Sequence, residues 1–260
     1  GVDELSSRKG FKYLSVFVDM ETHGVLFASE GKGSDTFEKF TTELYLHNSH
    51  PAAITEISMD MGAAYQKGAK EQLRNATVVF DHFHIMQNIN KAVGLVCSRE
   101  RRKKGQIKKL LSHPRTLQKN EDKLREDEKK LIEKMKELKL STGLAHQMRL
   151  ALQEVFRTTS TVKALLGFKA WTKWAREEPE DHFEKFILSP MRKMGESIEA
   201  KLESIISRWR HGTSNAALEG LNSVFSAVKR RSRGFKSDEY LKWMLYLTAG
   251  KLPGIPNLIP

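Results

Sequence analysis

This chain has 260 residues, and the order of its apolar runs up to residue 80 limits the possible folds more than any other feature. Runs at 2–6, 13–18 and 25–30 are separated by short polar turns, which is typical of consecutive antiparallel strands. Runs at 53–59 and 77–80 are separated by a helical pattern, which favours parallel strands joined by right-handed crossovers. We therefore predict an α/β fold whose mixed five-stranded sheet has three antiparallel and then two parallel strands, flanked by helices.

Beyond residue 81 the pattern predicts helices almost throughout. Leucines recur every seven residues at Leu117, Leu124, Leu131 and Leu138, and we interpret this stretch as one arm of a helical hairpin. These patterns predict a large all-α insertion before the last helix of the core. The predicted limits are 1–98 for the first part of the core, 99–200 for the insertion, 201–252 for the last part and 253–260 for an extended tail.

The composition narrows the class of partner. A formal charge of +12 and a pI near 9.6 point to a polyanion, most simply nucleic acid, although a surplus of lysine for solubility is an alternative. The single cysteine, Cys97, excludes an intrachain disulfide and suits a reducing cytoplasm. No run approaches the roughly 18 apolar residues of a membrane span. Because the chain starts without Met inside a predicted strand, we expect a fragment of a longer protein.

A late helix carries a carboxylate next to a concentration of positive charge. Glu219 and Asn222 lie beside an apolar face that recurs at helical spacing and includes Leu221 and Phe225. The basic residues that follow are Lys229, Arg230, Arg231 and Arg233. This combination indicates an acid that holds a metal ion near a phosphate backbone.

Two aspartates occupy positions from which they could bind the same metal ions as Glu219. Asp3 lies in the first strand and Asp60 ends the fourth, where an open α/β sheet usually binds its ligands. If these strands are neighbours, about 4.8 Å apart, the two carboxylates can share divalent ions. Mg²⁺ and Mn²⁺ prefer oxygen ligands, so two or three carboxylates suffice. An isolated aspartate beside a turn is more often a cap, and the prediction depends on the three acids together.

Four motifs in order give a more specific indication. The segments Gly1-Val-Asp-Glu4, Ser58-Met-Asp-Met61, Phe80-Asp-His-Phe-His84 and Asn215-Ala-Ala-Leu-Glu-Gly-Leu-Asn222 resemble the ISL3 family of insertion-sequence transposases. The resemblance spans essentially the whole chain. It implies a ribonuclease H-like catalytic core of the DDE type, with Asp3, Asp60 and Glu219 holding two divalent ions, Mg²⁺ or Mn²⁺. It also implies cleavage of DNA at transposon ends by water, followed by attack of a 3′-hydroxyl on target DNA.

The first acid of this triad has a competitor. Asp19 ends a good strand, but that strand is the second of the three and leads into a tight turn. The ribonuclease H-like layout has its first acid on the first strand. We therefore predict Asp3 and keep Asp19 as the alternative.

Asp81 and His84 form an accessory pair, which together with Asn222 could contact the scissile phosphate or orient a metal ligand. The spacing resembles a motif of Mutator-like transposases. A zinc site would need more His or Cys partners than the sequence offers. His84 could also cap a helix or lie in a core.

Three groups of residues are predicted to contact DNA. Lys229, Arg230, Arg231 and Arg233 form the first, and Arg101, Arg102 and Lys103 form a second that opens the insertion. Contacts of this kind give affinity and salt dependence without reading sequence. Trp209 could stack on a frayed base, although large aromatic residues on helices more often belong to a core.

The expected function is that of a metal-dependent DNA transposase acting on transposon ends and target duplex. We expect a homo-oligomer on DNA, no membrane partner, no small-molecule substrate, and a cytoplasmic location with association to the nucleoid when DNA is bound. The alternatives are a non-catalytic DNA-binding or scaffold protein with the same fold, and a ribonuclease H-like nuclease that cleaves without joining.

Overall fold

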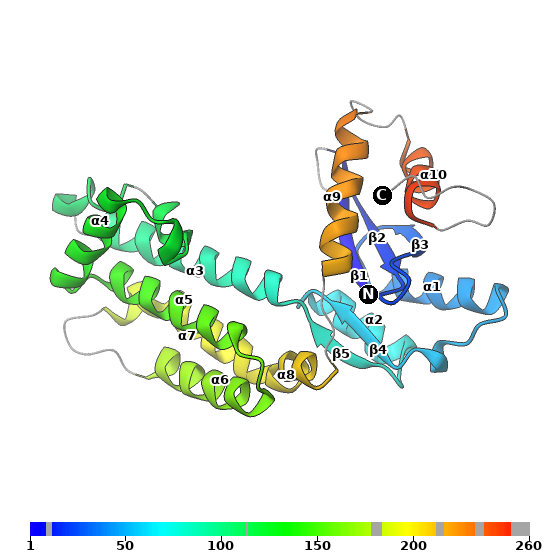
Figure 1. The fold of residues 1–260 in the computed structure, drawn as a ribbon, viewed down its shortest axis with the longest axis horizontal. Coiled ribbons are helices and arrows are strands. Elements are labelled where there is room, and N and C mark those ends of the chain that lie inside the picture. Colours follow the sequence, from blue (N-terminus) through cyan, green and yellow to red (C-terminus); the bar gives the residue numbers. More distant parts are fainter. Residues whose placement is uncertain are drawn as a thin grey trace. The chain divides into compact units, whose positions relative to one another are not determined.

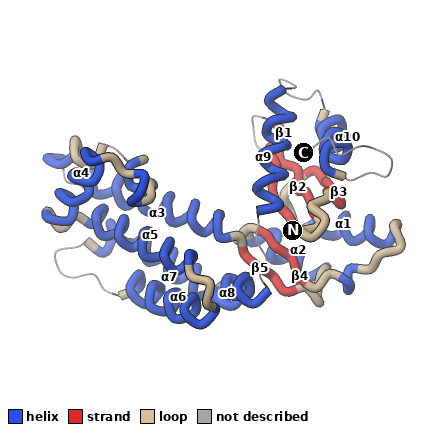
Figure 2. The backbone as a smooth tube through the Cα atoms, in the orientation of Figure 1, coloured by secondary structure: helices blue, strands red, loops and turns tan. Residues whose placement is uncertain are grey.

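The computed structural model describes residues 1–8, 12–103, 105–112, 114–177, 184–211, 216–231 and 237–250. The chain forms two compact units. One consists of Gly1–Asp81 with His211–Pro260 and contains all the strands that the structure describes, whereas the described part of the other, His82–Arg210, is helical (Figures 1 and 2). The helical unit contains the predicted insertion 99–200.

Strands β1 (Val2–Arg8), β2 (Lys12–Val18) and β3 (Val25–Glu30) form an antiparallel sheet in the order β1-β2-β3. This confirms the predicted meander. In the register of β1 and β2, Leu5 lies opposite Leu14 and Glu4 lies opposite Ser15. Because successive side chains of a strand point to opposite faces, Leu5 and Glu4 lie on different sides of the sheet.

An aromatic cluster covers the face of the sheet that carries Phe17. Its ring stacks on Phe40 with 4.2 Å between centroids and meets Phe37 edge to face at 5.2 Å. Both partners belong to α1 (Asp35–Leu46), whose aromatic residues recur at helical spacing. Burial of each such ring contributes about 1.5–3 kcal/mol, so α1 is held mainly by this face.

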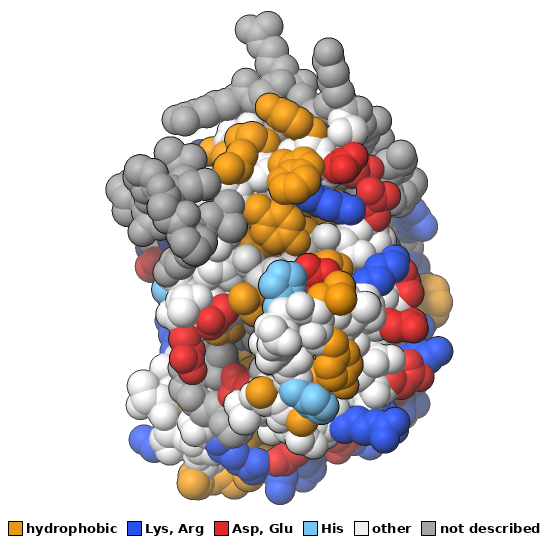
Figure 3. All heavy atoms as spheres, turned by 90° about the vertical axis from the view of Figure 1, so that its right-hand side faces the viewer, with side chains coloured by type: hydrophobic (Ala, Val, Ile, Leu, Met, Phe, Trp, Pro, Cys, Tyr) orange, Lys and Arg blue, Asp and Glu red, His pale blue; other side chains and the backbone are white. Residues whose placement is uncertain are grey.

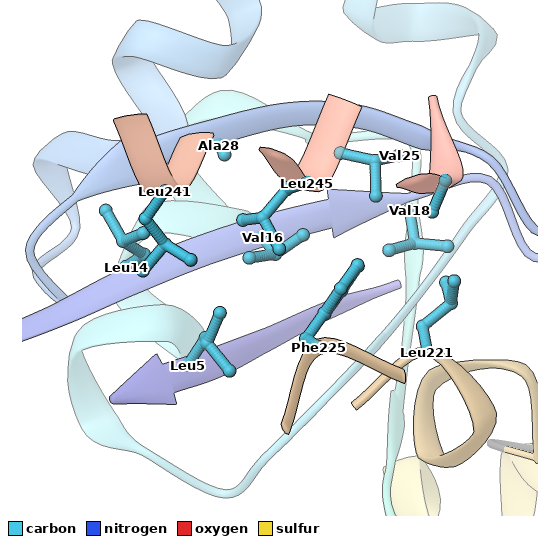
Figure 4. Packing of buried hydrophobic residues seen from close by; sticks show 11 residues of the cluster. Leu5, Leu14, Val16, Val18, Val25, Ala28, Leu221, Phe225, Leu241 and Leu245 are labelled. Atoms are coloured by element: carbon cyan, nitrogen blue, oxygen red, sulfur yellow. The ribbon is translucent and has the colours of Figure 1, made fainter. Parts of the chain in front are cut away.

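The opposite face of the sheet is covered by α9 (Ala216–Arg231) and α10 (Asp238–Ala249). Figure 4 shows Leu221 and Phe225 of α9 and Leu241 and Leu245 of α10 converging on Leu14, Val16 and Val18 of β2. The buried cluster consists of Leu5, Leu14, Val16, Val18, Val25, Ala28, Leu221, Phe225, Leu241, Leu245 and Ala249. This cluster fixes the late helix that carries Glu219 to the first three strands.

Helix α10 also reaches the end of the sheet. The backbone N–H of Ala28 in β3 donates to the hydroxyl of Tyr246 at 2.9 Å. On its outer side α10 exposes Tyr240, Trp243 and Leu247, and Figure 3 shows hydrophobic side chains gathered on this face of the molecule.

A second, parallel sheet consists of β4 (Glu56–Met59) and β5 (Thr77–Phe80). The connection contains α2 (Ala63–Gln72), and the short turn η1 (Pro51–Ala53) precedes β4. Strand β4 lies against β1, but in the described residues the two sheets form separate ladders. The mixed α/β class is therefore confirmed, while a single five-stranded sheet stays a prediction.

In the helical unit, α3 (His82–Lys103) packs against α5 (Ser141–Arg157) and α7 (Lys185–Ala200), and α6 (Thr161–Arg176) lies against α5 and α7. The remaining elements are η2 (Gly105–Ile107), η3 (Thr116–Gln118), η4 (Glu121–Lys123), α4 (Glu126–Glu137) and α8 (Leu202–His211). Within the described ranges, every helix is too short or too polar to span a lipid bilayer.

The prediction of one continuous helical arm through Leu117 and Leu138 is wrong. The chain forms two short 3₁₀ turns before α4, with Leu117 buried and Leu138 49% exposed. The buried guanidinium of Arg149 holds this segment, donating to the carbonyl oxygens of Gln118 at 2.8 Å and Lys119 at 3.0 Å. Short turns can present several carbonyl oxygens to one side chain, which a continuous helix cannot.

The carboxylate of Glu128 gives this region a predictable dependence on pH. The hydrogen bond from Lys119, followed by those from the backbone N–H of Arg125 and the hydroxyl of Thr116, lowers the pKa of Glu128 to about 2. A carboxyl group whose pKa is lowered on folding stabilises the folded state above its unfolded pKa, near 4.5, and loses this contribution as the pH falls towards 2.

We expect Glu128→Gln to lower the urea midpoint of the helical unit at pH 7, and the difference from wild type to shrink below about pH 4.5. Unfolding can be followed by tryptophan fluorescence in a Trp243→Phe background, because the other three tryptophans lie in this unit. Glu133→Gln, which removes an exposed pair with Lys136, is the control and should change little. A Glu128→Gln difference that is constant from pH 7 to pH 3 would contradict this account.

Candidate active site

The first predicted acid lies on the face of the sheet that α9 covers. Asp3 is half-buried in β1 and lies directly opposite Val16 of β2. Residues directly opposite in an antiparallel pair project to the same side, and Val16 belongs to the cluster that contacts α9. One carboxylate oxygen of Asp3, Oδ1, accepts the backbone N–H of Glu4 at 2.7 Å.

The second acid, Asp60, follows β4 and is half-buried. Its Oδ1 accepts the backbone N–H of Gly62 at 2.7 Å, which folds the carboxylate back over the start of α2. A Cβ atom at position 62 would stand 2.7 Å from the same oxygen. Glycine at this position therefore allows the turn that holds the carboxylate of Asp60.

The elements that carry the two aspartates adjoin, and a buried tyrosine lies on α2, the helix that follows Asp60. Strand β1 lies against β4, and burial together with the carboxylates of Glu4, Asp60 and Asp3 raises the pKa of the Tyr65 phenol well above its usual range. The phenol oxygen lies 2.5 Å from Oγ of Ser15, and Oγ of Ser15 donates to the carbonyl oxygen of Gly31 at 2.9 Å. The contact of β1 with β4 thus brings together the elements that carry Asp3 and Asp60, while the buried phenol of Tyr65 links α2 to β2 on the face of the sheet opposite to Asp3.

The third acid is positioned through its helix. Glu219 belongs to α9, two residues before Leu221, which packs on the sheet close to Val18 (Figure 4). Asn222 lies on the same helix, and the side chains of Glu219 and Asn222 are outside the described residues. Among the described side chains no group of three His, Cys, Asp or Glu residues forms a metal site, so closure of the triad by Glu219 stays a prediction.

Asp19, the alternative first acid, closes the hairpin between β2 and β3. Its Oδ1 accepts the backbone N–H groups of Glu21 at 2.8 Å and Thr22 at 3.3 Å. Burial raises the pKa of Asp19, but the hydrogen bonds from Glu21 and Thr22 outweigh it and hold the pKa below its usual value. These contacts account for Asp19 as a turn residue.

The accessory pair stays a prediction. Asp81 is buried at the end of β5, and its backbone N–H continues the parallel ladder by donating to the carbonyl oxygen of Met59 at 3.0 Å. His84 lies in the first turn of α3, where its ring meets that of Phe83 edge to face. Asp81 belongs to the unit with the sheets and His84 to the helical unit.

The predicted DNA-contacting residues differ in their surroundings. Lys229 donates to the carbonyl oxygen of Ser6, and Arg230 is exposed on α9. The side chain of Arg231 and all of Arg233 lie outside the described residues. In the helical unit Arg101 and Arg102 are exposed at the end of α3, and Lys103 forms an ion pair with Glu184.

Trp209 has packing partners on α5 and α6. Its ring stacks on Phe156 with 5.9 Å between centroids and meets Phe168 edge to face at 5.8 Å. The indole N–H donates to the carbonyl oxygen of Thr158 at 2.7 Å. These contacts give Trp209 a role in the helical unit, and base stacking on it stays a prediction.

Sequence reasoning did not single out Tyr65 or Ser15. The available signal was a tyrosine five residues after Asp60, on the apolar side of α2, but nothing in the pattern identified its partner in β2. We expect Tyr65→Phe to weaken Mn²⁺ binding roughly tenfold, because the hydroxyl links α2, the helix that follows the Asp60 turn, to Ser15 of β2. Titration of Mn²⁺ followed by electron paramagnetic resonance measures this, with the exposed Tyr240→Phe as control. An unchanged Mn²⁺ affinity in Tyr65→Phe would show that the phenol does not position the acid.

Comparison with known proteins gives a family. The sequence model of a transposase family, the DDE transposases of the ISL3 type, matches residues 1–245. The transposase for insertion sequence element IS1001 of Bordetella parapertussis is 23% identical over 249 residues, which cover 92% of this chain and 58% of that protein. The chain thus spans less than two thirds of the length of this curated relative. No solved structure matches the chain significantly.

Proposed function

The chain belongs to the ISL3 family of DDE transposases, and we propose that it cleaves DNA strands at transposon ends and joins the freed 3′-hydroxyl to target DNA. The observation that supports this proposal is the contact between β1, which carries Asp3, and β4, which leads into Asp60, together with the Glu219 helix that covers the Asp3 face of the first sheet. All three acids belong to one compact unit although the sequence separates them widely. A ribonuclease H-like core with β1 beside β4 is consistent with this arrangement.

The donor set fits Mg²⁺ or Mn²⁺. Asp3 and Asp60 are half-buried carboxylates on adjoining elements, and these ions prefer oxygen ligands. We propose that Asp3, Asp60 and Glu219 hold two such ions. When bound, the ions would supply an activated nucleophile and stabilise the departing oxygen.

The proposed chemistry has two steps, and in each an incoming oxygen replaces a 3′-oxygen on a phosphorus of DNA. In cleavage, the oxygen of water forms a bond to phosphorus, the bond to the 3′-oxygen breaks, and that oxygen leaves with a proton as a 3′-hydroxyl. In joining, this 3′-oxygen gives up its proton and bonds to a phosphorus of the target, whose bond to the target's own 3′-oxygen breaks; that oxygen takes up a proton and leaves as a 3′-hydroxyl. We assign to Asp81, His84 and Asn222 contact with the scissile phosphate or orientation of a metal ligand.

The partner of this chemistry is double-stranded DNA. We propose that Lys229, Arg230, Arg231 and Arg233 follow the phosphate backbone beyond the end of α9, and that Arg101, Arg102 and Lys103 form a second contact. We also propose that copies of the chain pair on two transposon ends, in the cytoplasm and at the nucleoid. The net charge of +12 supports a polyanionic partner.

A two-stage assay tests the function. The protein is incubated with Mg²⁺ or Mn²⁺ and a duplex that carries the DNA flanking its own coding sequence, and nicking is read on a denaturing gel. A second duplex with a pre-cut 3′-hydroxyl end and a supercoiled target plasmid then reports joining. We expect both products, and neither in EDTA.

The alternatives give different results in this assay. A scaffold protein would bind DNA and yield no product in either stage. A nuclease would nick the first duplex but leave the pre-cut end unjoined. Either result would overturn the proposed function.

A further inference from the structure

Helix α6 (Thr161–Arg176) has an unusual outer surface. Among its exposed residues are the apolar side chains of Val162, Leu166 and Trp174. Lysines at positions 163, 169 and 173 are exposed between them, and residues 161–176 contain no Asp or Glu. The helix therefore presents positive charge and apolar surface together, with no negative charge of its own.

The inner surface of α6 packs within the helical unit. Phe168 and Trp171 are buried, and the indole N–H of Trp171 donates to the carbonyl oxygen of Met148 at 2.7 Å. Close approach of the neighbouring helices depends on glycines, because a Cβ atom on Gly167 would stand 2.9 Å from Val155 and one on Gly195 would stand 2.9 Å from Ala175. The packing thus fixes which residues of α6 face outwards.

The cations of this outer surface are poorly compensated. In the part of the chain that the structure describes, neither Lys163 nor Lys169 forms an ion pair, and Lys173 has only a long, exposed pair with Glu177 at 3.7 Å. Such a pair contributes little in water.

Helix α4 of the same unit has a different arrangement of charged side chains. It mixes acidic and basic residues along its whole length and pairs Lys129 with Glu126 at 2.6 Å and Lys136 with Glu133 at 3.2 Å. Charges on a helix that serves only solubility are expected to be mixed and paired in this way. The cations of α6 therefore indicate an external anion.

We propose that the outer surface of α6 binds the phosphate backbone of duplex DNA. The positive charge of this surface is complementary to a polyanion. The polyanion that a transposase binds is DNA, so the choice of DNA rests on the proposed function. The lysine ammonium groups contact phosphates, while Leu166 and Trp174 lie against the sugars. These contacts do not read base sequence, so the surface adds affinity for DNA outside the cleaved bond.

A salt series on matched variants tests the surface. Lys163→Ala/Lys169→Ala removes two charges from α6, and Lys129→Ala/Lys130→Ala removes two charges from α4. Affinity for duplex DNA is measured in EDTA, without catalysis, at NaCl concentrations from about 50 to about 300 mM. The slope of log K against log salt is negative, and for the α6 variant we expect its magnitude to decrease by about 1.8, or about 0.9 for each phosphate that the variant no longer neutralises. The α4 variant should keep the wild-type slope.

Equal slopes in the two variants would overturn the proposal. Wild-type DNA affinity in the α6 variant, combined with abolished binding to phosphatidylserine vesicles, would overturn it in favour of a membrane partner. Melting temperatures equal to wild type within error verify that both variants fold. The strand-cleavage assay on wild-type protein separates this proposal from the proposed function. If wild-type protein cleaves DNA but the two variants have equal salt slopes, only the DNA-binding role of α6 is refuted. If the salt slope of the α6 variant changes but wild-type protein does not cleave, only the proposed chemistry is refuted.

Discussion

Replacing Asp60 by Asn, or Glu219 by Gln, is expected to lower the rate of strand cleavage by at least about a thousandfold. Each change removes a negative charge from the proposed metal site and leaves the size of the side chain almost unaltered. In Asp60→Asn the Oδ1 atom can still accept the N–H of Gly62, so the turn before α2 should persist. The expected loss therefore comes from metal binding and not from unfolding.

Asp19→Asn is the matched control for these variants. Its carboxylate caps the β2–β3 hairpin through the N–H groups of Glu21 and Thr22, and the amide can keep the Oδ1 contact. We expect cleavage by Asp19→Asn within a few-fold of wild type, and about a thousandfold loss for Asp3→Asn. The reverse result would move the first acid to Asp19.

Binding of Mn²⁺, followed by electron paramagnetic resonance, gives a readout that needs no DNA. Asp60→Asn and Glu219→Gln should each weaken binding, whereas Asp19→Asn should not. Full cleavage activity in Glu219→Gln would refute the assignment of the triad.

The second large effect is expected for Glu100→Ala, which should destabilise the helical unit by about 2–4 kcal/mol. Glu100 in α3 is fully buried, and its carboxylate accepts the backbone N–H groups of Ser141 at 3.0 Å and Thr142 at 2.9 Å. These groups begin α5 and would otherwise lack partners inside the helix. Alanine leaves both donors buried without an acceptor, and the cavity adds to the cost.

The single cysteine offers a direct measurement of this effect. Cys97 is 2% exposed and lies one turn before Glu100 on α3, and burial raises the pKa of its thiol. A thiol reagent should therefore react only after the packing of α3 against α5 opens. Each loss of about 1.4 kcal/mol raises the labelling rate about tenfold, so Glu100→Ala should label about 30 to 700 times faster.

Glu133→Ala, on the exposed side of α4, provides the comparison and should label at the wild-type rate. A Glu100→Ala rate within about threefold of wild type would show that the carboxylate is not needed to start α5. Far-ultraviolet circular dichroism verifies that both variants retain their helices before labelling.

The strands were predictable because their signals are local. The apolar runs at 13–18 and 25–30, separated by a short polar turn, indicate the meander, and the helical pattern between 59 and 77 indicates the parallel pair. The position of Asp60 at the end of β4 follows from the same signals. The side of the sheet on which Asp3 lies depends on the register with Val16, which short-range pattern does not determine.

Contacts made by buried polar groups could not be predicted. The spacing of Leu117 and its successors suggested one helical arm, whereas the carbonyl groups that bind Arg149 require the chain to break into turns. Tyr65 and Ser15 are separated by 50 residues, and each is ordinary in its local sequence. Such pairs are selected by the tertiary fold, which satisfies a buried hydroxyl wherever a partner happens to lie.

The hydrogen bond from Ala28 to Tyr246 has a consequence for assembly. The sheet order ends at β3, so the outward N–H groups of this strand are the ones that could pair with a strand from another molecule. At Ala28 that donor is already occupied by a side chain of α10. A strand of another molecule would therefore have to displace Tyr246 in order to pair with β3 at this position. If copies of the chain pair on two DNA ends, as we propose, joining them through this edge would first require α10 to release Ala28.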